Sequence, residues 1–257
     1  MTSNSNLIAH LTAQLQARGF DLVVPFRTQV YNACCLETAS GKPLPPLPTF
    51  QRSSTCALLI GNTKSLWPHF VAHCKRNAET VSVAQDPLDD FVSGEIEAAI
   101  TAEAPSVVSE TRFTHSKEDK FVHFQRLAHE VGAAFFNKSV FLCVHPVYGP
   151  WFAFRAVIAF DLDFDSFISR SIANTPVNLN LPTPIADPFP ECQFNVQECM
   201  NQFYAAAKDY NNRADENHKY LIAARDAATT MSAQEYRYEA DQLRYHYTKD
   251  KTCLGIL

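Results

Sequence analysis

Glycine is scarce in this chain of 257 residues, with seven copies spread far apart. A dinucleotide-binding G-x-G-x-x-G turn, a Walker A loop and a G-x-S-x-G nucleophile elbow each need closely spaced glycines, because the backbone must approach a phosphate or bend sharply. The sequence therefore excludes these three sites. Any nucleotide or flavin would have to be held without a glycine-rich phosphate loop.

Long apolar runs and an excess of positive charge are also missing. No stretch approaches the run of about 18 apolar residues that predicts a membrane-spanning helix, and the net charge is −5. The N-terminal segment has no signal-peptide pattern, and its single arginine, Arg18, is too few for a transit peptide. We expect a cytosolic (cytoplasmic) protein that binds neither membranes nor nucleic acid.

Cysteine and histidine patterns typical of metal or disulfide frameworks do not occur. The eight cysteines include no C-x-x-C pair, which indicates reduced thiols in a chain of this length. His69 and His73 have the spacing that places two side chains on one helical face, but no third ligand accompanies them at a recognisable spacing. We expect no metal ion held by protein side chains.

Apolar residues are plentiful, at 46% of the chain against 19% charged residues, which is enough for a sizeable core. Strand-like and helix-like segments mix without strict βαβ alternation, which favours an α+β fold. We expect one domain over residues 1–257, with a core of sheet and helices at about 19–165 and a helical C-terminal part at about 190–250.

Periodicity predicts the main elements of that core and of the C-terminal part. Predicted strands cover residues 20–31, 55–60, 105–113, 140–144 and 151–160; predicted helices cover 6–17, 65–77, 94–102 and 117–136. The segment 145–150 is predicted as the hairpin loop between the last two strands. Residues 166–190 read as loop, and the helical C-terminal part is expected to break near Asn211 and Thr229.

Arg155 is the most informative single residue, because it is the only charged residue in the strand-like segment 151–160. Burying a guanidinium is costly unless an anion or hydrogen-bond acceptors meet it. Two interpretations stay open: an internal carboxylate partner, or a ligand that bears a carboxylate or phosphate and is gripped by the arginine fork.

Several segments together resemble the cobalamin-processing methylmalonic aciduria and homocystinuria type C family. The resemblance is carried by residues 19–26 (GFDLVVPF), 31–32 (YN), 43–48 (PLPPLP), 129–136 (HEVGAAFF) and 143–155 (CVHPVYGPWFAFR), and more weakly by 224–227 (ARDA) and 234–238 (QEYRY). It implies a fold similar to flavin nitroreductases, with an antiparallel sheet flanked by helices and a helical C-terminal third.

The resemblance also implies an activity. Family members act as cytosolic chaperones and enzymes that bind cobalamin base-off and remove its upper ligand, by glutathione-dependent dealkylation or by reductive decyanation of cyanocobalamin. Thiol oxidase side activity, a flavin (FAD or FMN) and NADP belong to the same expectation. Implied partners are the type D methylmalonic aciduria protein and the methionine synthase system, and the implied oligomeric state is a monomer or a ligand-induced homodimer.

The family's binding residues transfer to matching positions of this chain. The expected cobalamin contacts are Val122, His123, Phe124, Gln125, Phe136, Asn137, Lys138, Cys143 and Phe154. The expected glutathione-binding residues are Arg155, Arg225 and Lys251. A third family arginine falls on Cys253, so Lys251 or Lys249 is expected to substitute for it. No side chain is expected to be catalytic, because the glutathione thiolate and the cobalt react.

Two other functions stay open as alternatives. The chain could carry cobalamin without reacting it, or act as a flavin-dependent reductase of the nitroreductase type. The chain also departs from the family before Cys143, where a longer family segment is reduced to about two residues. We therefore expect a different solvent access to cobalt.

Overall fold

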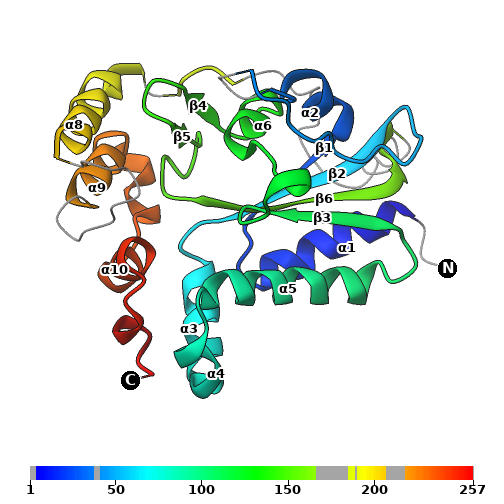
Figure 1. The fold of residues 1–257 in the computed structure, drawn as a ribbon, viewed down its shortest axis with the longest axis horizontal. Coiled ribbons are helices and arrows are strands. Elements are labelled where there is room, and N and C mark those ends of the chain that lie inside the picture. The colour runs from blue at the N-terminus through cyan, green and yellow to red at the C-terminus, as the bar shows by residue number, and fades with distance from the viewer. Residues whose placement is uncertain (1–3, 38–40, 166–184, 189, 207–217, 257) are drawn as a thin grey trace.

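The computed structural model describes residues 4–37, 41–165, 185–188, 190–206 and 218–256 (Figure 1). The strands are β1 (Leu22–Arg27), β2 (Thr55–Asn62), β3 (Ser109–Phe113), β4 (Phe135–Asn137), β5 (Leu142–Val144) and β6 (Ala153–Asp163). The α-helices are α1 (Asn4–Ala17), α2 (Thr28–Cys34), α3 (Leu66–Arg76), α4 (Ala78–Val83), α5 (Pro87–Glu103), α6 (Phe124–Glu130), α8 (Gln193–Ala206), α9 (His218–Ala227) and α10 (Ala240–Thr248). Short 3-10 turns are η1 (Glu118–Lys120), η2 (Pro190–Cys192), η4 (Met231–Tyr236) and η5 (Lys251–Leu254).

A four-stranded antiparallel sheet in the order β1-β2-β6-β3 forms the centre of the molecule. Helices α1 and α5 cover one face, and α2 and α6 cover the other (Figure 1). Both faces of β2 are buried: Leu58 and Ile60 join the core on the α1–α5 face, and Leu59 joins the core on the α2–α6 face. The predicted α+β class, with helices flanking an antiparallel sheet, is confirmed.

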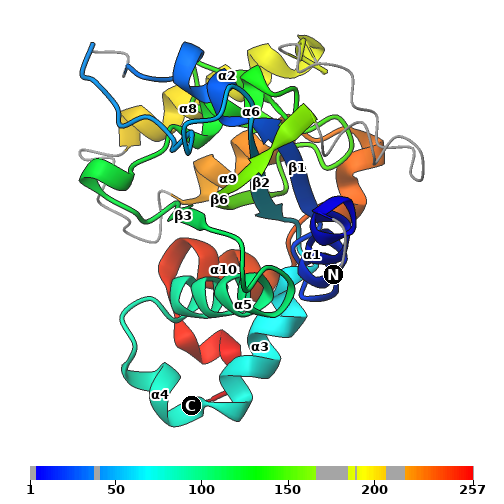
Figure 2. The same cartoon turned by 90° about the vertical axis from the view of Figure 1, so that its right-hand side faces the viewer.

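The C-terminal part is helical where it is described, and its last helix returns to the α1–α5 side of the sheet. Figure 2 shows α10 beside α5 and α3. The ring of Tyr245 on α10 lies 5.6 Å from that of Trp67 and 5.4 Å from that of Phe70. These aromatic contacts attach the end of the chain to α3. Among the described residues, no helix has the length and apolar character needed to cross a membrane.

The pairing of β2 with β6 contains a β-bulge at Arg155. Ile60 lies opposite Ala156, whereas Gly61 lies opposite Phe154, so Arg155 is an extra residue on β6. Side chains alternate between faces along a strand, and one extra residue reverses that alternation. Phe154 consequently packs with the α2–α6 core, and Arg155 points to the opposite face, toward α3.

The predicted helix over 117–136 is wrong. The chain forms η1, an extended stretch, the short helix α6 and then β4. Glu118 has a φ of 52°, which no helix interior accommodates. At the other end, Gly132 has a φ of 72° and terminates α6 in the left-handed conformation that favours glycine. The capping start predicted at Ser116 also fails, because its hydroxyl accepts the backbone N–H of Phe113 instead.

The predicted hairpin at 145–150 is also wrong, although both flanking strands exist. His145 and Gly149 exchange backbone hydrogen bonds of 2.8 and 2.9 Å, which closes a tight turn. Beyond that turn β6 enters the main sheet, while β5 pairs with β4 in a separate two-stranded sheet.

The strand predicted over 20–31 ends at Arg27, where α2 begins. Within α2, the side-chain oxygen of Asn32 accepts the backbone N–H of Leu47, and the side-chain nitrogen donates to the Leu47 carbonyl. These two hydrogen bonds attach the proline-rich segment to α2. The predicted break near Thr229 is confirmed by the gap between α9 and η4. The break near Asn211 and most of the loop at 166–190 lie outside the described residues.

Candidate functional site

The residues expected to contact cobalamin lie together on the α2–α6 side of the sheet. They come from the start of α6, the β4–β5 hairpin and β6; we call them the hairpin site: Val122, His123, Phe124, Gln125, Phe136, Asn137, Lys138, Cys143 and Phe154. Elements that follow one another along the chain thus contribute to one place.

Ring contacts and strand pairing hold the hairpin site together. Phe136 pairs with Cys143 across the β4–β5 ladder. The His123 ring meets the edge of Phe136 at a centroid distance of 5.9 Å, and Phe124 stacks on Phe154 at 6.3 Å. The site is therefore lined by aromatic rings, which suit a large, flat, partly apolar ligand.

Burial shifts the pKa values of two groups at the hairpin site, His123 and Cys143, toward their uncharged forms. Burial lowers the pKa of His123, and the nearby charge of Arg126 adds to that effect. Its Nδ1 accepts the Arg126 backbone N–H at 3.4 Å, at the start of α6. Burial raises the pKa of the Cys143 thiol, so this cysteine is not a thiolate nucleophile at neutral pH.

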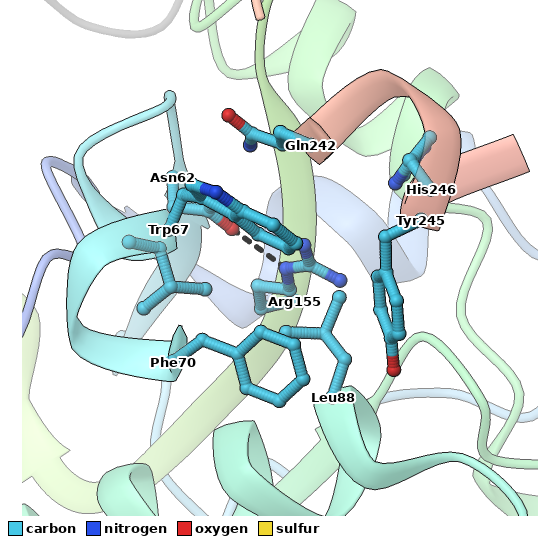
Figure 3. A pocket seen from close by; sticks show the side chains of 9 residues that line it. Asn62, Trp67, Phe70, Leu88, Arg155, Gln242, Tyr245 and His246 are labelled. Atoms are coloured by element: carbon cyan, nitrogen blue, oxygen red, sulfur yellow. Dashed lines mark hydrogen bonds between the residues drawn. The ribbon is translucent and has the colours of Figure 1, made fainter. Parts of the chain in front are cut away.

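On the opposite face, Arg155 lines a small cavity between α3 and α10 (Figure 3). The cavity holds about 10 Å³, which is room for about one water molecule. We call it the Arg155 cavity; its lining is Asn62, Leu66, Trp67, Phe70, Leu88, Arg155, Gln242, Tyr245 and His246. In Figure 3, α3 and α10 approach the guanidinium from opposite sides.

Arg155 has no carboxylate partner within salt-bridge distance among the described residues. Its exposed fraction is 8%, and its Nε donates to Asn62 Oδ1 at 2.6 Å. Burial lowers the pKa of Arg155, and electrostatic interactions with Tyr238, Asp89 and Asp86 partly offset this lowering. The sequence left two interpretations of Arg155 open, and the described residues do not contain the internal ion pair that one of them requires. The terminal nitrogens of the fork remain available for an anionic ligand.

Two side chains that line the Arg155 cavity carry a buried oxygen without a hydrogen-bond partner, and both oxygens point away from the guanidinium (Figure 3). Gln242 Oε1 and the Tyr245 hydroxyl are buried without a hydrogen bond of normal geometry. Buried polar groups are nearly always satisfied, so such a cluster calls for a water or a ligand. Sequence reasoning missed Asn62, Gln242 and Tyr245, since no local pattern distinguishes them from surface polar residues.

Arg225 and Arg155 both interact electrostatically with Tyr238. The Arg225 guanidinium carbon is 5.4 Å from the centroid of the Tyr238 ring, and its Nη2 donates to the Phe152 carbonyl at 3.3 Å. Burial raises the pKa of Tyr238, while the charges of Arg225 and Arg155 oppose the rise. Arg225 Nη1 and the Tyr238 hydroxyl are both buried without partners. Tyr238 ends the QEYRY segment, which was the only sequence signal for it.

Lys251 does not share this arrangement. Its ammonium donates to the carbonyl oxygens of Val81, Ser82 and Ala84 at 3.0, 2.8 and 2.7 Å. An ammonium has three N–H donors, so all of them are used to cap the end of α4. Lys249 instead pairs with the Asp86 carboxylate at 3.0 Å. The predicted glutathione contact at either lysine stays a prediction, and the geometry favours structural roles.

Comparisons with known proteins relate the chain to a family. The model of the methylmalonic aciduria and homocystinuria type C family matches residues 20–172. A chicken (Gallus gallus) protein named cyanocobalamin reductase / alkylcobalamin dealkylase is 28% identical over 158 residues, which is 55% of this chain. The aligned part spans 62% of the chicken protein.

A solved structure is similar over nearly the whole chain. It is the crystal structure of a C. elegans B12-trafficking protein, CblC, described as a homologue of human MMACHC. The TM-score is 0.66 at 18% sequence identity, and the match covers 98% of this chain and 94% of the other. At that identity the likeness establishes the fold.

Proposed function

The chain belongs to the methylmalonic aciduria and homocystinuria type C family, and on this basis we propose that it binds cobalamin and removes the upper ligand of its cobalt. The observation that carries the proposal is the placement of the hairpin site. Residues from α6, the β4–β5 hairpin and β6 converge there, and they are the same residues that the family resemblance assigns to cobalamin.

Cobalamin binds at the hairpin site in its base-off form. The chain has no D-x-H-x-x-G segment to supply a histidine below cobalt. The Nδ1 of His123 already accepts the Arg126 backbone N–H at the start of α6. A weakly held lower position makes cobalt easier to reduce and a better leaving group, which is what removal of the upper ligand needs.

Glutathione binds between Arg155 and Arg225. Two forked guanidinium groups suit the two carboxylates of glutathione. The unpartnered Tyr238 hydroxyl, near both arginines, supplies a further donor. The same positive charges favour the thiolate form of a bound thiol, because they stabilise its negative charge.

The dealkylation step conserves atoms and electrons. The thiolate sulfur attacks the cobalt-bound carbon and forms a thioether, and both electrons of the cobalt–carbon bond remain on cobalt as cob(I)alamin. The thiol proton is released to solvent. In decyanation, one electron from a reductant such as glutathione reduces cobalt(III) to cobalt(II), and cyanide leaves as the anion; two glutathione molecules reduce two cobalamins and form one disulfide, with their thiol protons released to solvent. The protein positions and shields the reactants, and the cofactor-like substrate carries the chemistry.

A non-catalytic carrier is the second candidate, and the small volume of the Arg155 cavity favours it. About 10 Å³ admits a water molecule but not a tripeptide. In the enzyme, α10 and its side chains Gln242 and Tyr245 must therefore move away from α3 before glutathione reaches Arg155. In a carrier no such movement is needed.

Flavin, NADP, thiol oxidase activity and the protein partners remain predictions. The Arg155 cavity is far too small for an isoalloxazine ring, and no step proposed here passes through a flavin. The described residues of this chain contain no feature that identifies a docking site for the type D protein or the methionine synthase system.

An anaerobic visible spectrum of the protein with methylcobalamin, before and after glutathione, tests the proposal. We expect a shift to the base-off spectrum on binding, followed by the spectrum of cob(I)alamin. A base-off shift without further change would make the protein a carrier. No shift at all would contradict cobalamin binding and favour a flavin-dependent reductase.

A further inference from the structure

Phe141 combines two features that a folded chain normally avoids. It follows the turn of the β4–β5 hairpin and leaves 60% of its surface exposed. Its φ is 53°, in the left-handed region that a bulky side chain rarely adopts. Strain of this kind persists where surrounding contacts impose it, and it concentrates at functional sites.

The surrounding contacts hold Phe141 from three directions. Gln125 Nε2 donates to the Phe141 carbonyl at 2.7 Å, which connects the strained backbone to α6. On the ring side, Phe136 lies at a centroid distance of 6.2 Å. Asn137 Oδ1 closes the turn by accepting the Ser139 backbone N–H at 3.1 Å and its hydroxyl at 2.7 Å. The exposed ring is therefore placed by the fold.

The hydrogen bond from Gln125 to Phe141 gives Gln125 a positioning role that the sequence did not predict. Gln125 was expected to contact cobalamin, and one N–H of its amide donates to the Phe141 carbonyl. Gln125 thus positions an aromatic ring beside Phe136, which belongs to the hairpin site. Phe141 itself was not among the residues that the resemblance transfers.

We propose that Phe141 is a further cobalamin-binding residue, whose ring packs against the corrin. The proposal rests on the proposed function, because it adds a contact to the same site. A single exposed ring is too small to support a protein interface, which buries at least about 1,000 Å². It suits a flat ligand that is already surrounded by the rings of the hairpin site.

The length of the hairpin supports this assignment. Only four residues separate Asn137 from Leu142, which pair at the end of the β4–β5 ladder. Such a short turn adds little chain of its own at this edge, so the exposed ring of Phe141 is the part of the turn placed to cover the ligand. Excluding water from cobalt in this way reduces its accessibility to competing reactions.

Three substitutions at Phe141 test the inference by titration with methylcobalamin, followed by visible spectroscopy. Phe141→Ala is expected to raise the Kd about ten-fold, since it removes apolar contact area. Phe141→Tyr keeps the ring and is expected to bind within about two-fold of wild type. Phe141→Gly is expected to weaken binding like Phe141→Ala while raising the melting temperature, because glycine relieves the backbone strain.

Met231→Ala is the matched control, because Met231 is 95% exposed on η4 and belongs to neither site. It is expected to leave the Kd unchanged. If wild type binds methylcobalamin and Phe141→Ala binds it equally well, the inference is overturned and the proposed function stands. If wild type does not bind, the proposed function fails as well. Unchanged affinity with a changed oligomeric state in size-exclusion chromatography would overturn the inference in favour of a protein contact.

Discussion

The hairpin site around Phe154 and the cavity around Arg155 lie on opposite faces of β6, and they differ in the side chains that form them. The hairpin site is aromatic and mostly buried or half-buried, whereas Lys138 at its turn and the neighbouring Phe141 are exposed. The Arg155 cavity mixes polar and apolar side chains, and two of its buried atoms, Gln242 Oε1 and the Tyr245 hydroxyl oxygen, lack a hydrogen-bond partner. One extra residue in β6 separates the two.

The difference follows from what each region is proposed to hold. A large, flat ligand gains most of its binding energy from apolar contact, so aromatic rings gather at its proposed site. A carboxylate gains most from charge-assisted hydrogen bonds in a dry place, so the donors must be buried before the ligand arrives. The first arrangement costs backbone strain at Phe141, and the second costs desolvation of Arg155.

The largest expected effect separates the two regions by function. Arg155→Ala should lower kcat/KM for glutathione in dealkylation about 100-fold, because it removes a charge-assisted contact, and should change the Kd for cobalamin less than about three-fold. Steady-state rates with methylcobalamin and equilibrium titration measure the two quantities. Equal loss of both would mean that Arg155 is structural.

Arg112 provides the matched control for this substitution. It is a second buried arginine, 6% exposed, but protein atoms occupy its fork: Glu110 at 2.7 Å and the carbonyl of Pro46 at 2.8 Å. Arg112→Ala should therefore lower the free energy of unfolding and leave the glutathione dependence intact. Denaturant unfolding of both variants distinguishes a ligand-binding arginine from a structural one.

A substitution at Gly61, beside the β-bulge, should have a smaller effect that extends to both the hairpin site and the Arg155 cavity. A Cβ at Gly61 would lie 2.7 Å from the Ala153 carbonyl oxygen, closer than side-chain carbons approach backbone. Gly61→Ala should lower the free energy of unfolding by about 2 kcal/mol and weaken cobalamin and glutathione binding together. Gly94→Ala, on the exposed side of α5 with open space around it, should instead stabilise by about 0.5–1 kcal/mol. Loss of one ligand alone in Gly61→Ala would mean that the bulge does not couple the sites.

The smallest effect concerns the end of the chain. Lys251→Ala should lower the free energy of unfolding by about 1 kcal/mol through its lost hydrogen bonds to α4, and should leave the KM for glutathione unchanged. Thermal unfolding and initial rates measure the two. A raised KM at full stability would restore Lys251 to the glutathione site.

Local patterns in the sequence predicted a large part of this fold. Periodicity placed β2 and α3 closely, and the mixture of elements indicated the α+β class. It failed over 117–136, because an apolar spacing typical of a helix does not reveal the positive φ angles at Glu118 and Gly132. It also failed at 145–150, because pairing of β5 with β4 depends on residues distant from the turn.

The sequence by itself determined the family, the aromatic residues of the hairpin site and the isolated charge of Arg155. Each of these depends on residue identity or on neighbours along the chain. Only the tertiary structure decided which face of β6 Arg155 occupies, that Lys251 is consumed by α4, and that Gln242 and Tyr238 stand unpartnered near the arginines. These facts depend on strand register and on contacts between distant segments, which no local pattern contains.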